Sequence, residues 1–108
     1  RLKAVEFPIK DYAWQSIGIE VAEIPAQDRK RRDVPDAGVL IASVRPGGPA
    51  ARKGLKRGDY IVQVLDAGVG SVSDFNRLLP RIASMQRGSL FLRIVRDGYI
   101  APLSLRLD

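Results

Sequence analysis

The chain contains no cysteine and no histidine among its 108 residues. Without cysteine there is no disulfide, no thiolate metal site and no cysteine nucleophile. Without histidine there is no Ser-His-Asp triad, no Cys-His pair and no histidine-ligated zinc. These two absences exclude most hydrolase and metalloenzyme classes, so we expect no catalytic residue, no metal and no cofactor.

Long apolar runs are also missing, and the longest run in the sequence is far too short to span a bilayer. No signal peptide is recognisable. The length predicts one domain, which is large enough to hold a core without disulfides or metals. Because the chain begins with Arg and not Met, we interpret it as a fragment of a longer protein. The short apolar runs predict no direct insertion of this fragment into a membrane.

Positive charge is in excess, with a net charge of +6. Such an excess suits an acidic partner, nucleic acid or an anionic membrane surface. Most basic residues are scattered, which favours solubility and predicts no nucleic-acid partner. The exception is the basic run at residues 29–32, in a stretch (residues 25–37) that we expect to be a polar loop with one helical turn at most. Binding through this run is the alternative, and its affinity would fall steeply with salt.

Residues 38–64 organise the rest of the chain and predict a strand, a turn, a short helix, a tight turn and a second strand. Pro46 has no N–H for a strand ladder, and Pro49 suits the first position of a helix. Gly54 is placed to end that helix in the left-handed conformation. Gly58 and Asp59 then form a turn before an apolar strand.

The C-terminal half predicts a helix and a hairpin. Residues 71–74 match a helix-start sequence, and apolar residues follow at helical spacing. Pro80 lies inside that pattern, so we expect the helix to end or kink near Leu79. Residues 89–96 and 99–107 predict two strands joined by Asp97-Gly98, with Pro102 on a sheet edge or at a strand start.

Two shorter stretches are harder to interpret. The two glycines in residues 67–70 predict a turn with positive φ, followed by a very short strand. Residues 1–12 predict either a linker or an extra edge strand, because Leu2, Ala4 and Phe7 alternate before Pro8 interrupts them.

This order of elements resembles a PDZ domain of the bacterial HtrA-type serine proteases. The resemblance is carried by Pro46-Gly47-Gly48-Pro49-Ala50, Lys53-Gly54-Leu55, Gly58-Asp59 and Arg96-Asp97-Gly98. It implies a mainly β fold with two helices, a PDZ-like partly open antiparallel β-barrel or sandwich over residues 13–108.

The resemblance also implies a peptide-binding site. In this family a loop of hydrophobic-Gly-hydrophobic form binds the C-terminal carboxylate of a peptide through backbone N–H groups, and Gly18 would provide the conformational freedom. The peptide then adds as a strand, and the second helix forms the opposite wall. The candidate peptide-binding residues are Ser16, Ile17, Gly18, Ile19, Glu20, Val21, Val72, Asn76 and Leu79. Taken alone, residues 16–19 also fit a plain turn into an ordinary strand.

We therefore expect a non-catalytic module that captures C-terminal or extended segments by strand addition. By resemblance, it would be a regulatory or substrate-recognition domain covalently attached to an HtrA-type serine protease, in the periplasm or another extracytoplasmic compartment. The alternatives are a PDZ domain of a membrane metalloprotease, of a C-terminal processing protease or of a non-protease scaffold. No serine has the Gly-x-Ser-x-Gly context of a nucleophile.

Overall fold

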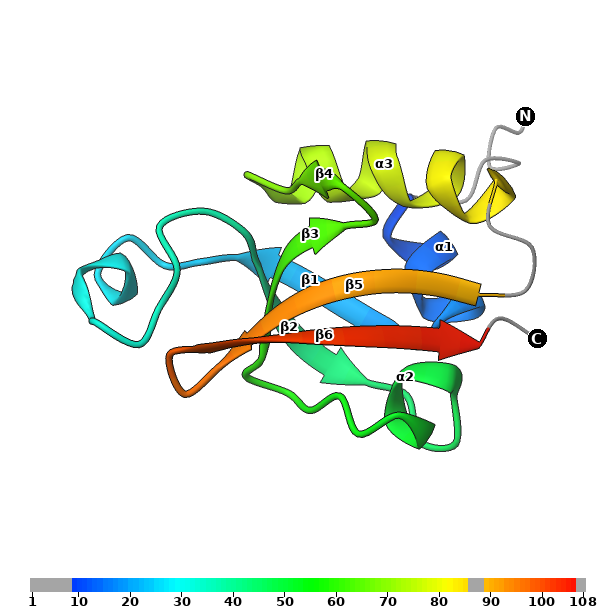
Figure 1. Ribbon diagram of the computed structural model, residues 1–108, viewed down its shortest axis with the longest axis horizontal. Helices are drawn as coiled ribbons and strands as arrows, with labels where there is room; N and C mark the ends of the chain where they lie inside the picture. Colours follow the sequence, from blue (N-terminus) through cyan, green and yellow to red (C-terminus); the bar gives the residue numbers. More distant parts are fainter. Residues whose placement is uncertain (1–8, 86–88, 107–108) are drawn as a thin grey trace, which may run out of the picture.

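The computed structural model describes residues 9–85 and 89–106, in which a six-stranded antiparallel sheet is combined with three α-helices (Figure 1). The strands are β1 (Ile19–Glu23), β2 (Val39–Val44), β3 (Tyr60–Val64), β4 (Ala67–Gly68), β5 (Ser89–Arg96) and β6 (Tyr99–Arg106). The helices are α1 (Ile9–Ser16), α2 (Pro49–Arg52) and α3 (Val72–Met85), with a 3₁₀ turn, η2 (Asp28–Lys30). The expected mainly β, open antiparallel architecture is confirmed.

The strand order is β1-β2-β3-β5-β6, with β4 paired to β3, so β1 and β6 form the two outer edges. Asp97 and Gly98 close the β5–β6 hairpin with φ values of 53° and 83°, as the sequence predicts. Tyr99 pairs with Arg96 across this two-residue turn, so the N–H groups of Ile100 and every second residue after it face away from β5. Pro102 occupies one of these positions, and its missing N–H therefore costs β6 no bond.

The core lies between the sheet and the helices. In α3, Phe75, Leu79 and Ile82 recur at helical spacing and are all buried. Figure 1 shows α3 along one side of the sheet, α1 tucked beneath its C-terminal half, and α2 on the opposite side near the end of β6. The largest fully buried side chains are Phe75, Ile17, Ile19, Ile41, Ile61, Leu79, Leu90, Leu92, Leu105, Val39, Val64 and Val69.

The central motif forms as the sequence predicts. Pro49 is the first residue of α2, and Gly54 follows the helix with φ of 91°. Gly58 turns the chain into β3 with φ of 97°. The predicted helical turn within the polar loop is also confirmed by η2.

Of the two outcomes expected at Pro80, an end of the second helix near Leu79 is wrong, because α3 continues through Pro80 to Met85. Proline removes the bond that residue 80 would donate to the Asn76 carbonyl. The turn beyond it carries Ile82, whose side chain is only 4% exposed. Burial of a side chain of this size contributes about 1.5–3 kcal/mol, which offsets most of the cost of the proline.

Two further differences concern the N-terminal region and the β3–β4 turn. Residues 9–12 belong to α1, a third helix that the sequence analysis did not anticipate, while the strand expected around Leu2 and Phe7 lies outside the described residues. The positive φ expected at the glycines of residues 67–70 occurs instead at Leu65, with φ of 55°. Val64 already pairs with Ala67, so the chain must reverse before either glycine.

Candidate functional site

The open edge of β1 is the first feature of the candidate site. Ile19 pairs with Val44 of β2, and the N–H of Arg45 donates to the carbonyl of Gly18 at 2.8 Å. In an antiparallel ladder this pattern makes Ile19 and Val44 a non-hydrogen-bonded pair. The N–H and C=O of Ile19 therefore face away from β2, toward the free edge, where a further strand can pair.

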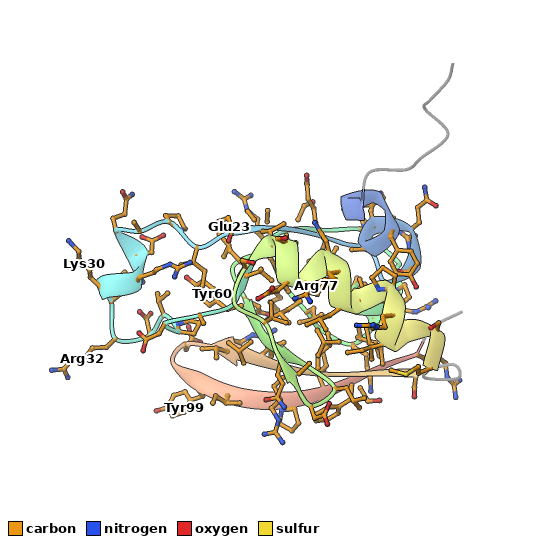
Figure 2. All side chains as sticks on the ribbon, turned by 90° about the horizontal axis from the view of Figure 1, so that it is seen from above. Glu23, Lys30, Arg32, Tyr60, Arg77 and Tyr99 are labelled. Carbon is orange, nitrogen blue, oxygen red and sulfur yellow. The ribbon has the colours of Figure 1, made fainter. Side chains whose placement is uncertain are left out.

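Helix α3 lies beside this edge. The backbone N–H of Val72, at the start of α3, donates to Oε2 of Glu23, at the end of β1, at 3.2 Å. Figure 2 shows Glu23 next to the first turn of α3. This contact fixes the N-terminal end of the helix against β1, and the carboxylate also complements the positive end of the helix dipole.

The loop before β1 contains the glycine geometry that the sequence predicts, with Gly18 buried and its φ at 82°. The N–H of Ile17 donates to the Ala13 carbonyl at 3.0 Å, and the N–H of Gly18 donates to the same oxygen at 2.8 Å. The first is an ordinary helical bond to the residue four back, and the second reaches five residues back to the same carbonyl. Two of the amides expected to bind a ligand carboxylate thus donate to a carbonyl of the protein itself.

The remaining candidate residues divide into a buried set and an exposed set. Ile17, Ile19 and Leu79 are at most 1% exposed and belong to one core cluster, whereas Glu20 points into solvent. Ser16 is half-buried, and its Oγ donates to the Tyr12 carbonyl at 2.6 Å.

The residues of α3 assigned to the groove wall lie on one flank of the helix. Val72 packs against the core cluster at the start of the helix, and Asn76 follows one turn later. The Oδ1 atom of Asn76 is buried and has no hydrogen-bond partner. A buried acceptor of this kind is satisfied when water or a ligand supplies a donor.

A second cluster, which the sequence analysis did not predict, lies away from this edge. Arg96 donates to both carboxylate oxygens of Asp59, at 2.8 and 2.5 Å, and to the carbonyl of Gly54 at 2.8 Å. The side-chain bond to Asp59 raises the pKa of Arg96 above its ordinary value. The two residues border a depression of about 370 Å³ that is also lined by Lys56, Arg57, Gly58 and Asp97. The sequence predicts Asp59 in a turn and Arg96 at the end of a strand, and neither prediction pairs the two residues.

The basic run lies on a loop that projects from the body of the domain. Figure 2 shows Lys30 and Arg32 at its far end, pointing outward. Arg29 turns back and donates to the carbonyls of Ile24 and Asp36, at 3.4 and 3.1 Å. Arg31 pairs with the Asp33 side chain at 3.3 Å, where both groups are exposed. The four basic side chains therefore do not form one uniform positive surface.

Among residues 9–85 and 89–106, no three Asp or Glu side chains gather closely enough to hold a metal ion. In the same part of the chain, no helix is both long and apolar enough to cross a membrane.

The chain belongs to the PDZ domain family, whose sequence profile matches residues 16–107. A protein of Marinomonas sp. (strain MWYL1), named as a probable periplasmic serine endoprotease DegP-like, is 37% identical over 83 residues, which are 77% of this chain and 17% of the relative. The putative serine protease HhoB of Synechocystis is 51% identical over 63 residues, which are 58% of this chain and 14% of the relative. The predicted resemblance to HtrA-type PDZ domains is confirmed.

Solved structures agree with this assignment. The PDZ domain of HtrA3, bound to a phage-derived ligand (FGRWV), has a TM-score of 0.66 at 23% identity, with 85% of this chain and 83% of that chain covered. The HtrA-type protease AlgW with a tripeptide has a TM-score of 0.63 at 29% identity, with 84% of this chain and 30% of that chain covered. The chain thus spans less than a third of AlgW and about a sixth of the DegP-like relative.

Proposed function

We propose that this domain captures extended peptide segments by strand addition at the open edge of β1, and that it recognises their free C-terminal carboxylate at residues 16–19. The observation that carries the proposal is the outward-facing N–H and C=O of Ile19 on an outer strand next to α3. Strand addition obtains its affinity from main-chain hydrogen bonds, and pockets for the side chains add specificity.

The solved relatives support this site by analogy. AlgW has been solved with a tripeptide and with a decapeptide, and it is 29% and 25% identical to this chain in those two structures. Within the site proposed here, Ser16, Ile17, Gly18, Ile19, Glu20 and Val21 would form the loop and strand side, and Val72, Asn76 and Leu79 the helix side.

The domain itself would be non-catalytic, and it would serve as a regulatory or substrate-recognition domain of an HtrA-type serine protease. Two of the relatives' names, DegP-like periplasmic serine endoprotease and serine protease HhoB, support this role. The word periplasmic in the first of these names also supports an extracytoplasmic location for this chain. The covalently attached protease domain and the unfolded or C-terminal segments that it would receive belong to the same proposal.

The test is a pair of peptides that end in the same apolar residue, one as the free acid and one as the C-terminal amide. A charge-assisted hydrogen bond contributes roughly 1.5–3 kcal/mol, so amidation should weaken binding about ten- to a hundred-fold. Calorimetry gives the two Kd values, and NMR amide shifts locate the site. Equal affinities, or shifts that avoid residues 16–23 and 72–79, would contradict the proposal.

A further inference from the structure

We propose that the last turn of α1 competes with the ligand carboxylate for the amides of Ile17 and Gly18, so that peptide capture is coupled to opening of this turn. The inference rests on the proposed function and concerns the regulation of the same site. In the structure the Ala13 carbonyl accepts from both amides, at 3.0 and 2.8 Å. A carbonyl oxygen of the protein thus accepts from two of the amides that the proposed function assigns to a ligand carboxylate.

The competing turn is held firmly in place. The Ala13 side chain is 1% exposed, and α1 contacts both β1 and α3, the two walls of the proposed groove. The Oγ of Ser16 and the Nε of Arg45 donate to the carbonyls of Tyr12 and Trp14, at 2.6 and 3.1 Å. These bonds stabilise the closed form, and they do not involve the amides for which the ligand would compete.

Electrostatic interactions favour binding of the carboxylate only after the last turn of α1 has opened. The C-terminal end of a helix carries partial negative charge, which disfavours an incoming carboxylate while the turn is intact. Opening the turn removes that repulsion and frees two N–H donors. Their bonds to a charged carboxylate are stronger than their bonds to a neutral carbonyl. The Arg45 side chain lies beside Gly18, with Nε 3.5 Å from the position that a Cβ would take there, and would face the carboxylate.

The test changes the helical tendency of α1 without altering the loop. Gln15 is exposed and lies in the last turn of α1, so Gln15→Gly weakens the turn and Gln15→Ala strengthens it. We expect the free-acid peptide to bind the Gly variant about fivefold more tightly than the Ala variant, which corresponds to the difference in helix propensity of about 1 kcal/mol. The amidated peptide should bind both variants about equally, because it competes for the amides only weakly.

A second measurement does not depend on the variants. Without ligand, the Ile17 and Gly18 amides should be protected from hydrogen exchange. When the free-acid peptide saturates the domain, residues 13–16 should lose their helical NMR chemical shifts. If peptide shifts map to β1 but both variants bind alike and α1 keeps its helical shifts, the competition is refuted and the proposed function stands. If no peptide binds at β1 in any variant, the proposed function itself fails.

Discussion

Arg96 and Asp59 stand 37 residues apart in the sequence, and the guanidinium of one donates to both carboxylate oxygens of the other. The Asp59 side chain is 5% exposed and also accepts the backbone N–H of Lys56 at 3.0 Å. The turn before β3 and the end of β5 are therefore joined by a buried carboxylate.

Asp59→Ala should lower the free energy of unfolding by about 2–3 kcal/mol, because a charged acceptor of several hydrogen bonds is lost. Arg96→Met should cost at least as much, since it leaves the buried carboxylate without its cation. In urea titrations, the double variant should be about 1–2 kcal/mol more stable than the sum of the single losses. Strictly additive losses would show that the two side chains do not depend on each other.

Gly38→Ala should be strongly destabilising. Gly38 has φ of +134°, and a Cβ there would lie 2.7 Å from the Ile61 carbonyl oxygen, which belongs to the backbone of β3. The expected loss is about 2–4 kcal/mol, from backbone strain and the steric clash together. Gly47→Ala is the matched control, because Gly47 has φ of +77° with no atom within 4 Å of the added Cβ. Gly47→Ala should lower the free energy of unfolding by only about 1 kcal/mol. A similar loss in both variants would show that the contact with the Ile61 carbonyl does not contribute.

Pro80→Ala should stabilise the domain, because it restores a backbone donor inside α3, where proline is about 3 kcal/mol less favourable than alanine. Proline also restricts the unfolded chain by about 0.4–1 kcal/mol, so a net gain of about 1–2 kcal/mol is expected. Thermal and urea unfolding both report this change. A loss of stability would mean that the packing of the last turn of α3 requires the proline.

The arginines of the basic run should differ in how much they contribute to the stability of the domain. Replacing Arg31 and Arg32 together by Ser should change the free energy of unfolding by less than about 0.5 kcal/mol, because both side chains are exposed. Arg29→Ser should cost more, about 1 kcal/mol, since it removes donors to two backbone carbonyls of the same loop. Equal effects in urea titrations would show that the Arg29 contacts contribute nothing to stability.

Local patterns predicted most of the fold. Glycine, proline and Asp-Gly signals placed the turns around α2 and in the β5–β6 hairpin, where backbone conformation depends on a few neighbouring residues. Alternating and helical spacing placed the long strands and the start of α3. The wrong predictions concern places where contacts between distant residues outweigh local conformational preference. Burial of Ile82 stabilises the part of α3 beyond Pro80. Pairing of Val64 with Ala67 requires the turn, and with it the positive φ, at Leu65.

The candidate site shows the same division. The sequence alone determined the Gly18 loop and the apolar strand after it, because only glycine tolerates that backbone conformation readily. Only the tertiary structure decided that β1 is an outer strand. The same holds for the ion pair of Asp59 with Arg96 and for the hydrogen bonds from the amides of Ile17 and Gly18 to the Ala13 carbonyl. Sheet order and long-range pairing depend on which surfaces exclude water together, and no local spacing in the chain carries that information.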